Sequence, residues 1–133
     1  MNQITIMEKY PVFSTEISKK ETSYTNVDEI LAYLKEQINA HPIATYIGEF
    51  DHYTHTCNLE AGEVNPKIKD AKNIICCFGK ALPKAEILAI RPRSIGVAEL
   101  ENSFVVSFLE APNPDANKAM ENWVKGIIKE HTS

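Results

Sequence analysis

Apolar residues recur at helical spacing in two stretches of the chain. Asn26 precedes the first stripe, with Glu29 three residues on, and Asn113 and Pro114 precede the second, which are typical helix-start patterns. The stripes consist of Val27, Ile30, Leu31, Leu34 and Ile38, and of Ala116, Ala119, Met120, Trp123, Val124, Ile127 and Ile128. We predict a helix at each stripe. The first ends at His41, a cation that would favour the negative end of the helix dipole, because Pro42 follows it.

Other stretches have the pattern of strands. Residues 3–17 predict an edge strand, or a strand broken near Pro11, which has no backbone donor. The run IICCF at 74–78 predicts a strand buried on both faces. The runs 94–100 and 103–110 predict a hairpin whose two-residue turn places Asn102 at positive φ.

Residues 45–57 predict a strand whose side chains alternate between two faces. One face would carry Ile47, Glu49, Asp51, Tyr53, His55 and Cys57, and the other Tyr46, Gly48, Phe50, His52, Thr54 and Thr56. A strand with so many ionisable groups on one face either faces water or lines a site. The polar segment 58–73 would be a long surface loop, and we consider that it forms a lid over this face.

The order of the elements predicts the fold class. Strand, helix and strand at the start favour a right-handed crossover between parallel strands, and a short helix is expected from Pro83 to about Ile90. Two amphipathic helices must bury their stripes against the same sheet face. We therefore expect one α+β domain over 1–133, a two-layer sandwich with a mixed sheet of about five strands. Two main helices and a short one would leave one sheet face open.

Composition and charge narrow the classes of function. The 133 residues fit one domain, and a net charge of −4 disfavours nucleic-acid binding. No segment has the length of a membrane span and the start lacks an export signal, so we expect a cytoplasmic protein without a membrane partner. Three cysteines cannot all pair internally, which favours reduced thiols.

Two groups of residues could carry chemistry. His55 and Cys57, with Cys76 or Cys77 and a carboxylate from Glu49 or Asp51, could bind zinc or iron, although packing is the commoner use of buried cysteines. The segment RPRS holds the chain's two arginines, Arg91 and Arg93, whose planar forks suit a small anionic ligand. The alternative for these arginines is ion pairing with Glu49, Asp51, Glu99 or Glu101.

A nucleophilic enzyme would need a base beside its cysteine. His55 and Cys57 are too far apart on a straight strand, whereas a cross-strand contact of His55 with Cys76 or Cys77 is geometrically better. Phosphate-loop, serine-elbow and zinc-protease motifs are absent from the sequence, and it identifies no cofactor.

Two short motifs carry a resemblance to a known family. A strand ends in Phe50, Asp51 and His52, and a later apolar strand ends in Phe78 and Gly79. This order, over roughly Ser14 to Leu109, resembles the small bacterial family catalogued as domain of unknown function 302, or an uncharacterised small bacterial family close to it. The resemblance implies a compact α+β domain that often self-associates. The chain departs from that family after Phe-Gly, in the insertion before Ile74 and in the closing helix, so only Asp51 and His52 could be carried over.

We expect a domain that binds a small ligand or a protein partner without catalysis, completed in some cases by a second copy as a homodimer. The expected ligand-binding residues are Glu49, Asp51, His52, Tyr53, His55, Arg91 and Arg93. The alternative is a thiol- or metal-dependent enzyme or redox protein that uses His55 with Cys57, Cys76 or Cys77.

Overall fold

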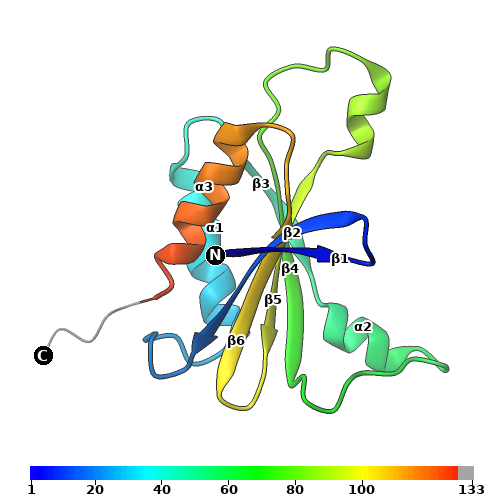
Figure 1. Cartoon of the computed structure of the whole chain (residues 1–133), viewed down its shortest axis with the longest axis vertical. Coiled ribbons are helices and arrows are strands. Elements are labelled where there is room, and N and C mark those ends of the chain that lie inside the picture. The colour runs from blue at the N-terminus through cyan, green and yellow to red at the C-terminus, as the bar shows by residue number, and fades with distance from the viewer. Residues whose placement is uncertain (129–133) are drawn as a thin grey trace, which may run out of the picture.

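The computed structural model, described here for residues 1–128, contains one antiparallel sheet with two helices against one face (Figure 1). The strands in this range are β1 (Asn2–Ile6), β2 (Tyr10–Ser18), β3 (Thr45–Phe50), β4 (Asp70–Cys77), β5 (Arg93–Glu99) and β6 (Ser103–Leu109). The helices are α1 (Val27–Ala40), α2 (His52–Asn58) and α3 (Pro114–Lys125), with a 3-10 helix, η1 (Ala85–Ala89), between β4 and β5. The predicted α+β class is confirmed, with six strands where about five were expected.

Helices α1 and α3 begin where their caps predict. Asn26 accepts a hydrogen bond from the backbone N–H of Glu29 at 2.8 Å, and Asn113 accepts one from that of Asp115 at 2.9 Å. Such caps act locally, because the side chain satisfies a backbone donor that the helix itself leaves unpaired. Glu29 accepts hydrogen bonds from the backbone N–H and the hydroxyl of Thr25, one residue before the cap, and a weaker one from the backbone of Asn26.

The sheet has the strand order β1-β2-β6-β5-β4-β3, and every neighbouring pair is antiparallel. The predicted parallel crossover is therefore wrong. Helix α1 carries the chain from β2 across the sheet to the far edge, where β3 pairs with β4, and β6 takes the place beside β2. The sequence around β2 does not indicate which distant strand will pair with it.

The N-terminal stretch forms a hairpin rather than one strand. The break comes at Met7 and Glu8, which adopt φ of 55° and 61°, while Pro11 stays within β2 opposite Thr5. Two successive positive φ values make a type I′ turn, which matches the twist of the strands it joins. Among the described non-glycine residues these two alone have positive φ, so the predicted left-handed Asn102 in the β5–β6 turn is wrong.

The predicted strand over 45–57 ends at Phe50. Asp51 caps α2 instead, accepting hydrogen bonds from the backbone N–H of Thr54 at 3.0 Å and from its hydroxyl at 2.9 Å. The alternation that placed Glu49, Asp51, Tyr53, His55 and Cys57 on one face is therefore wrong, because a helix starts in the middle of it. Strand β4 also starts four residues earlier than predicted, at Asp70, which shortens the surface loop.

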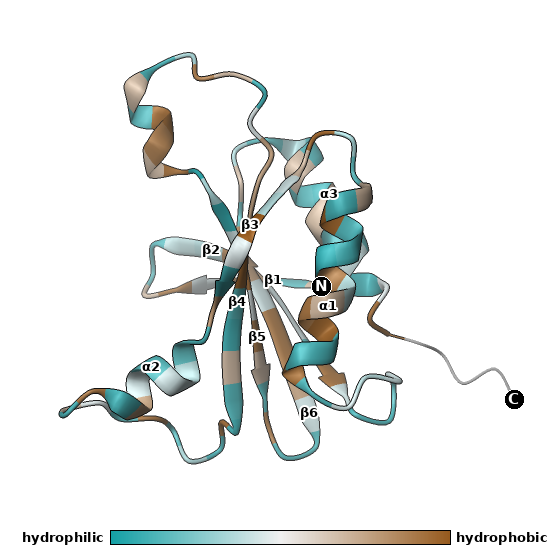
Figure 2. Ribbon diagram, turned by 180° about the vertical axis from the view of Figure 1, so that it is seen from behind, coloured by the Kyte–Doolittle hydropathy of each residue, from teal (hydrophilic) through white to brown (hydrophobic). Residues whose placement is uncertain are grey.

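The core lies between the sheet and the helices α1 and α3. Directly paired residues share a sheet face, so Ile17, Phe104, Val97 and Ile74 all point toward the helices, and each is at most 1% exposed. The other face, which we call the open face, carries no main helix, as predicted. Residues 79–92, which we call the arm, and α2 extend on the side of the open face, at opposite ends of β4 (Figures 1 and 2).

Candidate functional site

The predicted ligand-binding residues divide into two groups at opposite ends of β4. Glu49, on β3, pairs with Ile74 in the middle of β4, and the α2 residues follow Phe50, toward the start of β4 at Asp70. Arg91 and Arg93 lie beyond Cys77, where β4 ends. The α2 residues and the two arginines are therefore too far apart along β4 to line one small-molecule site.

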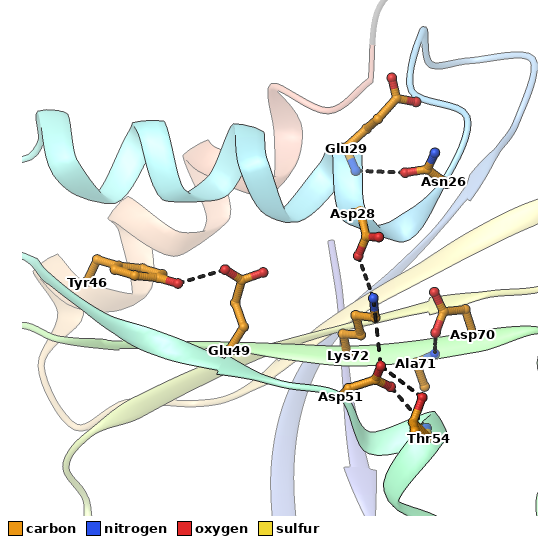
Figure 3. Close-up of polar contacts among 10 residues, drawn as sticks. All are labelled: Asn26, Asp28, Glu29, Tyr46, Glu49, Asp51, Thr54, Asp70, Ala71 and Lys72. Atoms are coloured by element: carbon orange, nitrogen blue, oxygen red, sulfur yellow. Dashed lines mark hydrogen bonds and ion pairs between the residues drawn. The ribbon is translucent and has the colours of Figure 1, made fainter. Parts of the chain in front are cut away.

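Lys72 is the central charged residue near the start of β4, and the sequence analysis did not predict a role for it. Its ammonium lies 2.6 Å from Asp28 of α1 and 3.8 Å from Asp51, so it links a helix on one side of the sheet to the start of α2 (Figure 3). The hydrogen bond that Lys72 donates to Asp28 raises the pKa of Lys72. Hydrogen bonds from Thr54, aided by nearby Lys72, lower the pKa of Asp51. This network positions helices, and its charges are mutually satisfied.

Glu49 and the α2 histidines also have local partners. The hydroxyl of Tyr46 donates to Glu49 at 2.7 Å (Figure 3). His52 and His55 both lie against the Phe50 ring, with centroid distances of 5.4 Å and 5.3 Å. The side chains of Glu49, His52 and His55 are exposed, and that of Tyr53 is half-buried. The arrangement is a small aromatic cluster that fixes α2 to the end of β3.

The structure does not bring the proposed metal ligands together. His55 and Cys57 are exposed on α2, whereas Cys76 is fully buried on the helical face of β4. Among residues 1–128, no group of three or more His, Cys, Asp or Glu side chains could hold a metal ion. The cross-strand contact predicted for His55 fails for the same reason, because α2 replaces the second half of the predicted strand.

The three thiols should differ sharply in reactivity. Burial raises the pKa of Cys76 to about 11 from an ordinary 9.0, which leaves about a hundredfold less thiolate near pH 8. In a Cys77→Ser variant, we expect iodoacetamide to label exposed Cys57 within the first sampling times and Cys76 only in denaturant. Peptide mass spectrometry separates the two sites. Equal labelling rates in the folded chain would contradict the assignment of Cys76 to the core.

At the other end of β4, Arg93 has a structural role that neither prediction described. Its side chain is 9% exposed and donates to two backbone carbonyls, that of Ile90 at 3.1 Å and that of Leu109. Burial lowers the pKa of Arg93. No ion pair to Arg93 occurs in the described part of the chain. Arg93 thus joins the end of the arm to the end of β6.

Arg91 is the arginine that remains available. Within residues 1–128 it forms no ion pair, and one guanidinium nitrogen, Nη1, donates to the carbonyl of Ala81 at 2.5 Å. Gly79 allows this side chain to fold back across the arm, because a Cβ at position 79 would lie 2.5 Å from Nη1. A guanidinium has five N–H donors, so most of the donors of Arg91 stay free for a ligand.

Two adjoining cavities meet at Arg91, between the arm and the helical layer. Their volumes are about 530 Å³ and about 300 Å³, and both are lined by Phe78, Arg91, Asn113 and Ala116. We call them together the Arg91 cavity. The walls of the smaller part include Ile87, Ile90 and Pro112, and Lys80 and Asp115 line the larger part. Binding sites for small molecules commonly have this size and this combination of apolar walls with few polar groups.

His41 lines the same cavity and is oriented by the backbone. Its Nδ1 accepts hydrogen bonds from the N–H groups of Ile43 and Ala44, both at 3.1 Å. A ring nitrogen that accepts carries no proton, so the ring N–H that can donate is at Nε2. The ring packs edge-on against Phe78 and Trp123, at 5.5 Å and 5.8 Å.

The chain matches the model of DUF6858, described as a family of unknown function, over residues 1–129, and it belongs to that family. Neither the curated proteins nor the solved structures contain a match. No helix within residues 1–128 is long and apolar enough to cross a membrane.

The family match corrects the resemblance to domain of unknown function 302, which is wrong. That resemblance depended on the order of elements and on the short motifs at Asp51-His52 and Phe78-Gly79. In the structure Asp51 begins a helix, and Gly79 makes room for Arg91. Both motifs thus have local explanations that many unrelated folds could share.

Proposed function

We propose that this chain binds a small molecule with an apolar body and a single carboxylate group in the Arg91 cavity, and that it acts as a binding protein. The observation that carries the proposal is a guanidinium that has no acidic partner within residues 1–128 and lies at the junction of two cavities with largely apolar walls. A planar carboxylate can accept two parallel N–H bonds from such a group.

The charges around the cavity favour a negative charge on the ligand. Lys80, Arg91 and Arg93 contribute three positive charges and Asp115 one negative charge, and Arg93 already donates to the carbonyls of Ile90 and Leu109, so Arg91 is the guanidinium with donors left for the ligand. A ligand with several charges, such as a phosphate ester, would approach Asp115 at an electrostatic cost. The N–H at Nε2 of His41 adds a donor on the same wall.

The apolar part of the ligand would lie against Phe78, Ile87 and Ile90. Ile87 is half-buried and Ile90 is 37% exposed, so these side chains gain contacts when the cavity is filled. The ring of Phe78 is fixed by stacking on Trp123 at 5.5 Å. A rigid aromatic wall loses little entropy on binding, which favours a ring or short alkyl chain as the ligand body.

Titration with 3-phenylpropionate, followed by amide NMR shifts, tests the proposal. We expect shifts at Phe78, Asn113 and Ala116, and at least about tenfold weaker binding of the neutral amide 3-phenylpropionamide, since a charge-assisted hydrogen bond contributes about 1.5–3 kcal/mol. Arg91→Gln should cause a similar loss for the carboxylate.

Lys84→Gln is the matched control, because Lys84 lies on the same arm, is exposed and lines neither part of the Arg91 cavity. It should bind as the unchanged chain does. The proposal fails if carboxylate and amide bind equally, or if neither shifts these amides at concentrations up to about 10 mM, where even millimolar affinity would register.

A further inference from the structure

The open face has small side chains at its centre and apolar side chains toward both edges. Its central residues are Ala71, Asn73, Gly96, Ala98 and Ser107, which line a shallow hollow of about 270 Å³. The surrounding apolar residues are between 41% and 54% exposed, and they are Ile4, Ile6, Tyr10, Leu109, Ile47 and Phe50. Apolar exposure of this extent on one face marks an interaction surface.

We propose that the open face is the interface of a homodimer, in which two copies stack face to face and the arm of each lies over α2 of the other. The Arg91 cavity lies against α3 and shares Lys80 and Arg91 with a cavity on the Ile47 side of the arm, but the proposed dimer needs no ligand and is tested without one. Two observations identify a second copy as the occupant: the distribution of charge and the area of the face.

The two extensions beside the open face have opposite charges. The arm, residues 79–92, carries Lys80, Lys84 and Arg91 against Glu86, a net charge of +2. The segment from α2 to the start of β4, residues 51–70, carries four carboxylates and two lysines, and because Asp51 pairs with Lys72 the net charge left on the segment is −1. Both extend on the side of the open face, at opposite ends of β4 (Figures 1 and 2). One chain therefore presents both halves of a complementary pair.

This distribution selects one of two ways to stack the sheets. A two-fold axis parallel to the strands would place arm over arm and α2 over α2, which brings like charges together. An axis in the plane of the sheet but across the strands exchanges the two ends and keeps the β4 side over the β4 side. Each arm then faces the α2 segment of the partner, and the interface is self-complementary, as two-fold symmetry requires.

The area of the face explains why the extensions must take part. Six strands at a spacing of about 4.8 Å, each about seven residues long, form a face of roughly 24 by 24 Å, or roughly 600 Å². A stable interface needs about 800 Å² from each partner. The exposed side chains of the arm supply further apolar surface, since Leu82 and Leu88 are 70% and 65% exposed beside a third cavity of about 480 Å³ that includes Ile47 and Cys77.

Sedimentation equilibrium tests the interface directly. We expect a dimer mass for the full chain at about 10–100 µM, because interfaces of standard size have dissociation constants from micromolar to picomolar. Ala98→Arg places a long charged side chain at the centre of the open face and should give a monomer. Ala32→Arg is the matched control, because Ala32 is exposed on α1, and it should remain a dimer. A monomer for the unchanged chain at concentrations up to about 1 mM would overturn the proposal.

Charge reversal tests the orientation and does not depend on whether Ala98→Arg folds. Lys80→Glu with Lys84→Glu, and separately Glu60→Lys with Glu63→Lys, should each weaken dimerisation at least about tenfold. The chain with all four substitutions should recover it, because the opposite charges are then exchanged rather than lost. If either pair leaves the affinity unchanged, or the fourfold variant stays as weak as the pairs, the arm does not face α2 of the partner.

Discussion

Replacing Phe104 with alanine is expected to lower the free energy of unfolding by about 4 kcal/mol, the middle of the range for a buried aromatic side chain. Phe104 is fully buried on the helical face of β6, and it is the largest side chain with no exposure among residues 1–128. Its removal leaves a cavity between β6 and the helices that close-packed neighbours cannot fill. Urea denaturation followed by circular dichroism measures the change.

Phe50 provides the matched comparison, since it is also a strand phenylalanine but is 41% exposed on the open face. Phe50→Ala should cost about 1 kcal/mol or less, mainly through lost contacts with His52 and His55. Both variants should be compared at one protein concentration, because dimerisation through the open face would stabilise the folded chain by an amount that depends on concentration and that Phe50→Ala would also change. Similar losses for the two variants would show that the core has been assigned to the wrong face.

Replacing Arg93 with methionine is expected to cost about 2 kcal/mol and to detach the arm. The carbonyls of Ile90 and Leu109 would lose their charged donor, and leaving one such group unsatisfied costs about 1–3 kcal/mol. Part of this cost is offset because methionine avoids the burial of a charge. Binding of 3-phenylpropionate should fall as well, although Arg91 itself is unchanged, because both the arm and Arg93 line the cavity.

Arg93→Lys distinguishes loss of charge from loss of geometry. A single ammonium keeps the charge but cannot reproduce the two diverging donors of a guanidinium. We therefore expect Arg93→Lys to lower the free energy of unfolding, but by less than Arg93→Met does. Hydrogen exchange of the arm amides, measured beside urea denaturation, reports whether the arm is released. Exchange that stays unchanged in both variants would contradict the anchoring role of Arg93.

The sequence predicted those parts of the fold that depend on near neighbours. Asn26 and Asn113 were identified as caps because a cap acts within three residues, and the apolar stripes of α1 and α3 follow from the geometry of the helix itself. The signal for α2 was also present, since Asp51 stands three residues before Thr54. It was missed because His52, Tyr53 and Thr54 continue a plausible alternation of a strand.

The sequence therefore determined the α+β class, both main helices and the open face. Tertiary structure alone decided that every strand pair is antiparallel, that Arg93 binds carbonyls while Arg91 stays free, and that Lys72 joins α1 to α2. These outcomes depend on contacts between residues far apart in the chain, such as Arg93 with Leu109 and Lys72 with Asp28. Periodicity reports which face of an element is buried, whereas only the folded chain determines what lies against it.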